Sequence, residues 1–149
     1  MTAELHAKVA ERLATIDRRY TAGRRLLVDA LYRAGSPLVL PAILARDPAL
    51  KQSSVYRNLA ALERADVVRR VLTDEGFGRY ELTEDLTGHH HHLVCSNCGA
   101  VEDVDLPRPF EDALEAQVDE LAHRIGFSAV SHRLDLIGLC RGCASAATA

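Results

Sequence analysis

Two CxxC pairs constrain this chain more than any other feature. Cys95-Ser-Asn-Cys98 and Cys140-Arg-Gly-Cys143 contain every cysteine in the 149 residues. Two such pairs supply four thiolates, the complete tetrahedral ligand set of a structural zinc. The other readings are a redox pair and inert buried thiols, but a redox CxxC opens a helix in a βαβ setting, whereas Cys98-Gly99 leads into an expected strand. The pattern predicts a four-thiolate zinc site.

Four consecutive histidines, His89–His92, come just before the first cysteine pair. On a strand, successive side chains face opposite sides, so His90 and His92 share one face, and His89 and His91 share the other. One tract could therefore feed two separate metal sites. A solvated loop and an affinity tag are the alternatives, and an internal run beside a CxxC pair disfavours the tag. Imidazole accepts Zn²⁺, Fe²⁺, Ni²⁺ or Cu²⁺, so the ligand type leaves the metal open.

The composition, 48% hydrophobic and 26% charged, is typical of a soluble globular protein. The sequence contains no apolar run near the ~18 residues that span a bilayer. Its first residues carry scattered charges instead of the apolar core of a secretory signal. We therefore expect a cytoplasmic protein with no membrane partner, in a reducing compartment where paired cysteines favour zinc over disulfides.

Charge is distributed unevenly along the chain. Residues 1–80 carry 14 Lys and Arg against 9 Asp and Glu, a net charge of +5, whereas residues 81–149 carry 4 against 12, a net charge of −8. A basic half joined to an acidic, ligand-rich half suggests a polyanion-binding module attached to a metal-binding module.

The first half has the periodicity of helices followed by a hairpin. Thr21 is an expected N-cap, Gly35-Ser36-Pro37 an expected helix end, and Ser53 or Ser54 the expected cap of the last helix. The expected helices cover residues 4–17, 21–35, 40–46 and 53–66, and the strands cover 67–72 and 79–82 around a turn at 73–78. This layout predicts a winged helix-turn-helix domain over residues 1–83, with its third or fourth helix in the DNA major groove.

The second half is expected to be a small α/β module. After a polar hinge at 84–88, strands are expected at 90–95, 100–104 and 130–139, with a helix over 107–125. The predicted fold class is α+β, with a metal-binding and dimerisation domain over residues 89–149. A module of this size needs a staple such as zinc.

Three strings resemble one known family: Tyr56-Arg57 on a capped helix, HHHHLVCSNCG, and SHRLDLIGLCRGC. From Thr21 to Cys143 the chain resembles the ferric uptake regulator superfamily of dimeric, metal-dependent transcriptional regulators. The resemblance implies a homodimeric repressor, not an enzyme, that binds a palindromic DNA operator when its regulatory metal is loaded. The alternatives are an iron-based peroxide-sensing repressor of the same fold and a zinc enzyme, which the absence of an HExxH motif disfavours.

The same resemblance implies three metal sites. The four cysteines match the structural zinc site. The regulatory site, for Zn²⁺ or Fe²⁺ with Mn²⁺ and Ni²⁺ left open, would use Glu81, His90, His92 and Asp103. The additional site would use His89, His91, Glu115 and His132, with Glu115 counted back from Gly126. Many members add a histidine from the DNA-binding domain, but Pro37 stands near that position here.

For DNA, the resemblance points to Tyr56 and Arg57. Arginine reads guanine O6 and N7, and a tyrosine ring packs against a thymine methyl. Further contacts to phosphates or bases are expected from other polar residues of that helix and from two arginines before and within the preceding helix. These residues are Ser53, Ser54, Asn58, Arg19 and Arg24.

Overall fold

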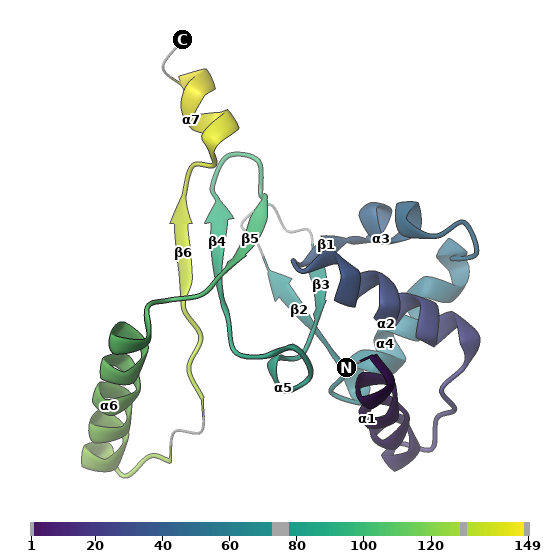
Figure 1. Cartoon of the computed structure of the whole chain (residues 1–149), viewed down its shortest axis with the longest axis horizontal. Coiled ribbons are helices and arrows are strands. Elements are labelled where there is room, and N and C mark those ends of the chain that lie inside the picture. Colours follow the sequence, from purple (N-terminus) through teal and green to yellow (C-terminus); the bar gives the residue numbers. More distant parts are fainter. Residues whose placement is uncertain (1, 73–77, 129–130, 148–149) are drawn as a thin grey trace. The chain divides into compact units, whose positions relative to one another are not determined.

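The computed structural model describes residues 2–72, 78–128 and 131–147, and the chain divides into two compact units, residues 1–89 and 90–149 (Figure 1). Each unit combines helices with a three-stranded sheet, which confirms the predicted α+β class. The turn expected at 73–78 lies, except for Gly78, outside the described residues. Across the described ranges, no helix combines the length and the apolarity needed to cross a membrane.

The helices of the first unit follow the sequence pattern closely. They are α1 (Thr2–Thr15), α2 (Ala22–Ala34), α3 (Leu40–Arg46) and α4 (Gln52–Arg64). Helix α2 begins where the Thr21 hydroxyl accepts the Arg24 N–H at 3.5 Å, and it ends at Gly35, whose φ of 61° is left-handed.

The expected cap of α4 was wrong. Ser53 and Ser54 lie inside the first turn, because the carbonyl of Lys51 already accepts the N–H groups of Ser54 and Val55 at 2.9 and 3.0 Å. Lys51 is therefore the N-cap residue, and Ser53 and Ser54 come two and three positions after it. Their hydroxyls stand instead at the positive end of the helix dipole, where they are available to an anion.

A continuous apolar core holds the first unit together. The helices and the sheet contribute fully buried side chains to it, among them Leu13, Leu27, Ile43, Leu59 and Leu62. Strands β1 (Leu38–Val39), β2 (Val68–Leu72) and β3 (Gly78–Leu82) form an antiparallel sheet in the order β1-β3-β2. Strand β1 was not predicted, since two residues are too few to show an alternating pattern.

A short helix, α5 (Glu84–Thr87), occupies the segment expected to be a hinge and belongs to the first unit. The Arg69 guanidinium on β2 pairs with the carboxylates of both Glu81 and Glu84. Burial alone would raise the pKa of Glu84, but hydrogen bonds from His89 and Arg69 hold that pKa below its ordinary value. On the other side of the helix, Arg12 pairs with Asp85. The placement of the domain boundary at 83 and of the hinge at 84–88 stays a prediction.

The second unit is built on the histidine strand. Strand β4 (His91–Cys95) lies between β5 (Val101–Val104), which is antiparallel to it, and β6 (Asp135–Gly138), which is parallel to it. Helix α6 (Arg108–Ile125) separates β5 from β6, and α7 (Arg141–Ala147), which was not predicted, follows β6. Strand β6 is shorter than the expected 130–139.

The centre of the second unit is polar. Its buried side chains, within 90–128 and 131–146, are those of His91, His92, Cys95, Val101 and Ala122. Both histidines are 2% exposed and count among the largest fully buried side chains of the chain. The centre of the second unit is therefore filled by residue types that bind metals, whereas the centre of the first unit is filled by leucine and isoleucine.

Candidate metal centres and nucleic-acid interface

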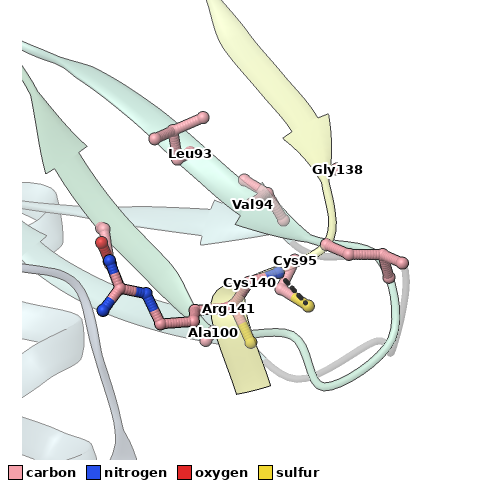
Figure 2. Close-up of a pocket in the computed structure, with 9 residues that line it drawn as sticks. Leu93, Val94, Cys95, Ala100, Gly138, Cys140 and Arg141 are labelled. Carbon is pink, nitrogen blue, oxygen red and sulfur yellow. Dashed lines mark hydrogen bonds between the residues drawn. The ribbon is translucent and has the colours of Figure 1, made fainter. Parts of the chain in front are cut away.

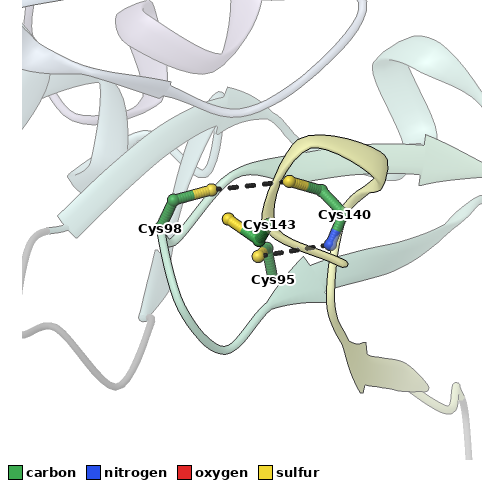
Figure 3. A group of neighbouring side chains, drawn as sticks. All are labelled: Cys95, Cys98, Cys140 and Cys143. Carbon is green, nitrogen blue, oxygen red and sulfur yellow. Dashed lines mark hydrogen bonds between the residues drawn. The ribbon is translucent and has the colours of Figure 1, made fainter. Parts of the chain in front are cut away.

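The four cysteines converge between the end of β4 and the start of α7 (Figure 3). Their sulfur atoms all lie within 4.8 Å of one another, and the sulfurs of Cys98 and Cys140 are 3.8 Å apart. A zinc ion with Zn–S bonds of 2.3 Å has sulfur atoms about 3.8 Å apart at the corners of its tetrahedron. The cluster therefore fits a structural zinc.

The backbone around the cluster favours thiolates. The N–H of Cys140 donates to the sulfur of Cys95 at 3.3 Å, and the side-chain amide of Asn97 donates to the sulfur of Cys143 at 3.2 Å. Backbone N–H groups, first that of Cys140, lower the pKa of the Cys95 thiol to about 6. The backbone N–H of Ala100 lowers the pKa of Cys98, but the neighbouring thiols outweigh it and raise that pKa to about 12. A metal ligand must be deprotonated, so a cation would bind to these crowded sulfurs in exchange for protons.

An apolar pocket lies beside the cysteine cluster (Figure 2). Its volume is about 520 Å³, and residues of β4 and β5, the end of β6 and the start of α7 line it. The residues that line it are Leu93, Val94, Cys95, Ala100, Glu102, Gly138, Leu139, Cys140 and Arg141. Leu93 is 44% exposed and Leu139 is 51% exposed, so apolar surface surrounds the candidate zinc site.

Three residues of the expected regulatory site meet in the second unit. The Nε2 atoms of His90 and His92 each lie 3.8 Å from a carboxylate oxygen of Asp103. The register explains the geometry, because His92 stands directly opposite Asp103 across β4 and β5. The rings of His90 and His92 meet edge to face, with centroids 5.3 Å apart.

Asp135 is a further member of this group that the sequence did not reveal. Its carboxylate lies 3.2 Å from Nδ1 of His92, opposite which it stands in the parallel pairing of β4 with β6. A carboxylate only accepts, so Nδ1 of His92 donates and Nε2 keeps its lone pair for a metal. Only the pairing of β4 with β6 brings Asp135 to His92, and a single sequence does not show that pairing.

A second histidine and carboxylate group lies at the start of α6. The carboxylate of Glu111 is 3.0 Å from Nε2 of His91 and 2.8 Å from Nε2 of His132. The two imidazole rings stack with their centroids 5.4 Å apart. The expected fourth member, His89, belongs to the first unit, where its Nδ1 lies 2.7 Å from Glu84.

Glu115 stays a prediction for this group, but in the structure Glu111 is the carboxylate that lies at His91 and His132, and Glu115 is exposed one helical turn away. Residues four apart lie on the same face of a helix, about 6 Å apart along its axis. Counting back from Gly126 therefore leads to the helix face that holds both glutamates, and the structure places Glu111 nearer the two histidines.

Both groups have donor sets that suit a divalent transition metal. Nitrogen and oxygen ligands at about 2.0–2.2 Å from one ion lie at most about 4.4 Å apart. The candidate ligand atoms within each group lie within 4.8 Å of one another, so small side-chain rotations are enough to close either group on an ion. The remaining expected ligand, Glu81, has a side chain that is 6% exposed and pairs with Arg69 within the first unit.

A basic hollow of about 510 Å³ lies along the exposed side of α4 in the first unit. The residues that line it are Arg18, Arg24, Ser54, Arg57, Asn58, Ala60, Ala61 and Arg64. Four of the seven expected DNA-binding residues are among them. The other three are exposed nearby in the sequence: Arg19, Ser53 and Tyr56, the last 53% exposed.

Sequence reasoning missed Arg18 and Arg64 as members of this surface. The signal was present for Arg64, because Ser54, Arg57, Ala61 and Arg64 follow each other at helical spacing of three or four residues along α4. Arg18 is brought to α4 by the loop before α2, which only the tertiary fold determines.

Residues 16–137 match the Ferric uptake regulator family. The chain belongs to that family. It is 37% identical over 100 residues to the ferric uptake regulation protein of Bacillus subtilis, an alignment that covers 66% of this chain and 63% of that protein. It is also 30% identical over 96 residues to the peroxide operon regulator of the same organism, covering 64% of this chain and 61% of that protein. The chain therefore matches less than two thirds of the length of these relatives.

The fold agrees with solved ferric uptake regulators. The structure is similar to that of Helicobacter pylori Fur with a TM-score of 0.74 and 23% identity, covering 97% of this chain and 94% of that one. This confirms the winged-helix unit followed by a small α/β unit, and the family assignment confirms the resemblance seen in the sequence.

Replacing Cys95 by serine should release about one zinc ion per chain and lower the melting temperature sharply, because a closed four-thiolate site loses an anionic ligand. Zinc content by mass spectrometry and thermal unfolding by circular dichroism measure both effects. Ser96→Ala, in the same turn, is the matched control and should keep the zinc. Undiminished zinc and unchanged stability in Cys95→Ser would show that the four cysteines are not the site.

Glu111→Gln should weaken binding of one non-structural ion at least roughly tenfold, because it removes an anionic ligand shared with two histidines. Glu115→Gln changes the same side chain one turn later on the same helix and should leave the affinity unchanged. Zn²⁺ titration of protein that retains its structural zinc measures both. The reverse ranking of the two variants would restore Glu115 as the ligand.

Proposed function

We propose that this protein is a metal-dependent, DNA-binding transcriptional repressor that controls genes of metal homeostasis. The observation that supports this most is the combination, in one chain, of a four-thiolate cluster, two groups of histidines and carboxylates, and a winged-helix unit with a basic recognition helix. The Helicobacter relative is described as having three functional metal-binding sites. Membership of a family of transcription regulators favours this function over that of a zinc enzyme.

The proposed metals follow from the donor atoms. The cysteines would hold structural Zn²⁺, since thiolate sets of this kind favour zinc. Mixed imidazole and carboxylate sets suit Zn²⁺ or Fe²⁺, and also Mn²⁺ or Ni²⁺. Glu81 would complete the His90, His92 and Asp103 set, and His89 would complete the set of His91, Glu111 and His132.

We propose that the second unit forms a homodimer. Among the residues that the structure describes, eight of the nine exposed large hydrophobic side chains belong to this unit, and three of them, Leu136, Ile137 and Leu139, lie on or just after β6. Strand β6 is at the edge of its sheet, where it pairs with β4 on one side. An exposed apolar edge strand is a template for pairing with a second copy. A two-fold dimer of this kind would present two recognition helices to a palindromic operator.

The regulatory site would act by restricting the orientation of the DNA-binding unit. Glu81 is the next-to-last residue of the wing strand β3 in the first unit, whereas His90, His92 and Asp103 belong to the second. A bound ion would supply a cross-link between these ligands, which lowers the number of orientations available and favours the one that fits DNA. The coupling required is only about 1–3 kcal/mol, which one bridging carboxylate can provide.

An iron-based peroxide sensor is the second candidate, supported by the 30% identity to the peroxide operon regulator of Bacillus subtilis. In that case, peroxide would oxidise a ligand histidine in Fe²⁺-loaded protein. Mass spectrometry of peptides that contain His90 and His92, after peroxide treatment with Fe²⁺ or Zn²⁺, separates the two functions.

Arg57→Ala should weaken binding to an operator selected from random DNA by about 1–3 kcal/mol and relax the preference at one base in each half-site, because arginine reads guanine. Arg64→Ala should instead weaken binding to all sequences and make the salt dependence shallower, as expected for a phosphate contact. Arg46→Ala on α3, away from the basic hollow, is the charge-matched control. A uniform loss for Arg57→Ala would make Arg57 a phosphate contact as well.

Glu81→Gln should weaken binding of the regulatory metal ion and reduce metal-activated operator binding, because the amide keeps the size of the side chain and removes its charge. His92→Ala should have the same effect, and His132→Ala a milder one, with the structural zinc retained in all three. Metal titration followed by operator binding measures this. Full metal-dependent activation in Glu81→Gln, or full operator affinity in wild-type protein that holds only structural zinc, would contradict the proposed mechanism.

A further inference from the structure

Glu81 already has a cationic partner in the first unit. Glu81 is 5% exposed, and its carboxylate accepts a hydrogen bond from Nε of Arg69 on the neighbouring strand. The register explains this contact, because Arg69 stands directly opposite Glu81 in the antiparallel pairing of β2 with β3. Opposite charges placed across two strands in this way attract each other.

The same guanidinium reaches a second carboxylate. Its terminal nitrogen lies 2.5 Å from Oε1 of Glu84. The other oxygen of Glu84 lies 2.7 Å from Nδ1 of His89. Arg69 therefore stands between the carboxylate proposed for the regulatory site and the carboxylate that holds a histidine proposed for the additional site.

We propose that Arg69 is a resident counter-cation that competes with the regulatory metal ion for Glu81 and so sets the metal concentration at which the protein responds. This inference rests on the proposed function, in which Glu81 is a metal ligand. Arginine keeps its charge at all physiological pH values, so this competition does not fade as pH changes.

The charge of Arg69 is expected to lower the affinity of the regulatory site for metal. A carboxylate shared with a guanidinium is a weaker ligand, and a fixed positive charge beside a divalent cation repels it, most strongly where water is scarce. The side chain of Arg69 is 21% exposed and that of Glu81 is 6% exposed, so screening by solvent is limited. Glu84 makes the exchange feasible, because Arg69 retains one carboxylate when Glu81 turns to the metal.

The opposing possibility is that Arg69 only orients Glu81. A residue that fixes the geometry of a ligand strengthens metal binding, and its loss weakens the site. The two roles therefore predict changes in affinity of opposite sign for the same substitution.

The experiment measures Zn²⁺ affinity by calorimetry in a His132→Ala background, which removes a ligand of the additional site, with structural zinc retained. Arg69→Gln should bind the regulatory ion about tenfold more tightly. Arg70→Gln is the matched control, because it removes the same charge from the next residue, whose guanidinium lies over the Tyr80 ring at 5.9 Å from its centroid. Its affinity should stay near that of the unsubstituted background. An unchanged or weaker affinity in Arg69→Gln would overturn the inference.

A double-substitution cycle separates this inference from the proposed function. Glu81→Gln alone should weaken Zn²⁺ binding, and adding Arg69→Gln should then raise the affinity by much less than in the background, because only the direct repulsion by the guanidinium is removed. If Glu81→Gln has no effect, Glu81 is not a ligand, and both the proposed regulatory site and the role of Arg69 fail. If Glu81→Gln weakens binding while Arg69→Gln matches the background, only the role of Arg69 fails.

A measurement on wild-type protein covers the case in which Arg69→Gln does not fold. The Nε–H of a buried, paired arginine exchanges slowly with water and gives a separate NMR signal. Adding Zn²⁺ should shift this signal of Arg69 and speed its exchange. A signal of Arg69 that keeps its position and its exchange rate at saturating Zn²⁺ would overturn the inference.

Discussion

The second unit depends on one constraint: its central positions are occupied by metal-binding side chains instead of apolar ones. His91, His92 and Cys95 are buried on β4, where only Val101 and Ala122 add buried apolar side chains among the described residues of 90–149. Buried polar groups are costly unless they are bonded. The carboxylates of Glu111 and Asp135 already bond the two histidines. A zinc ion at the four cysteines would staple this small unit, so its folding is expected to be coupled to binding of the structural zinc.

The first unit has an apolar centre, in contrast to the polar centre of the second unit, and this difference matches the two roles proposed for the protein. Its helices share a continuous apolar core that includes Leu27, Leu59 and Leu62, so the basic face of α4 rests on a rigid base. A DNA-reading surface needs fixed geometry, whereas a sensor needs a part whose order depends on the signal. In the proposed function the chain separates the two: the apolar core would hold the recognition helix, and the unit with a polar centre would respond to metal.

Local signals in the sequence determined most of what was predicted correctly. The Thr21 cap, the Gly35 terminus and the α3 bounds depend on neighbouring residues and were right. The features that the sequence did not reveal share a tertiary cause. Glu111 reaches the two histidines from the same helix face as Glu115, Asp135 reaches His92 only through the pairing of β4 with β6, and strand β1 exists only because β3 is beside it. A single sequence carries periodicity but not register between distant strands.

The network around Arg69 shows how the missing histidine near Pro37 affects the proposed switch. In the proposed regulatory site the first unit supplies one ligand, Glu81, instead of a histidine and a carboxylate. The coupling free energy between metal binding and the first unit therefore depends strongly on whether Glu81 is paired with Arg69 or bound to the metal. Arg69 holds that carboxylate in a defined position through the pairing of β2 with β3. A metal-free protein would then keep its wing strand ordered and its regulatory ligand neutralised. The threshold for metal would be set by competition between two cations for one carboxylate, and not only by the number of ligands.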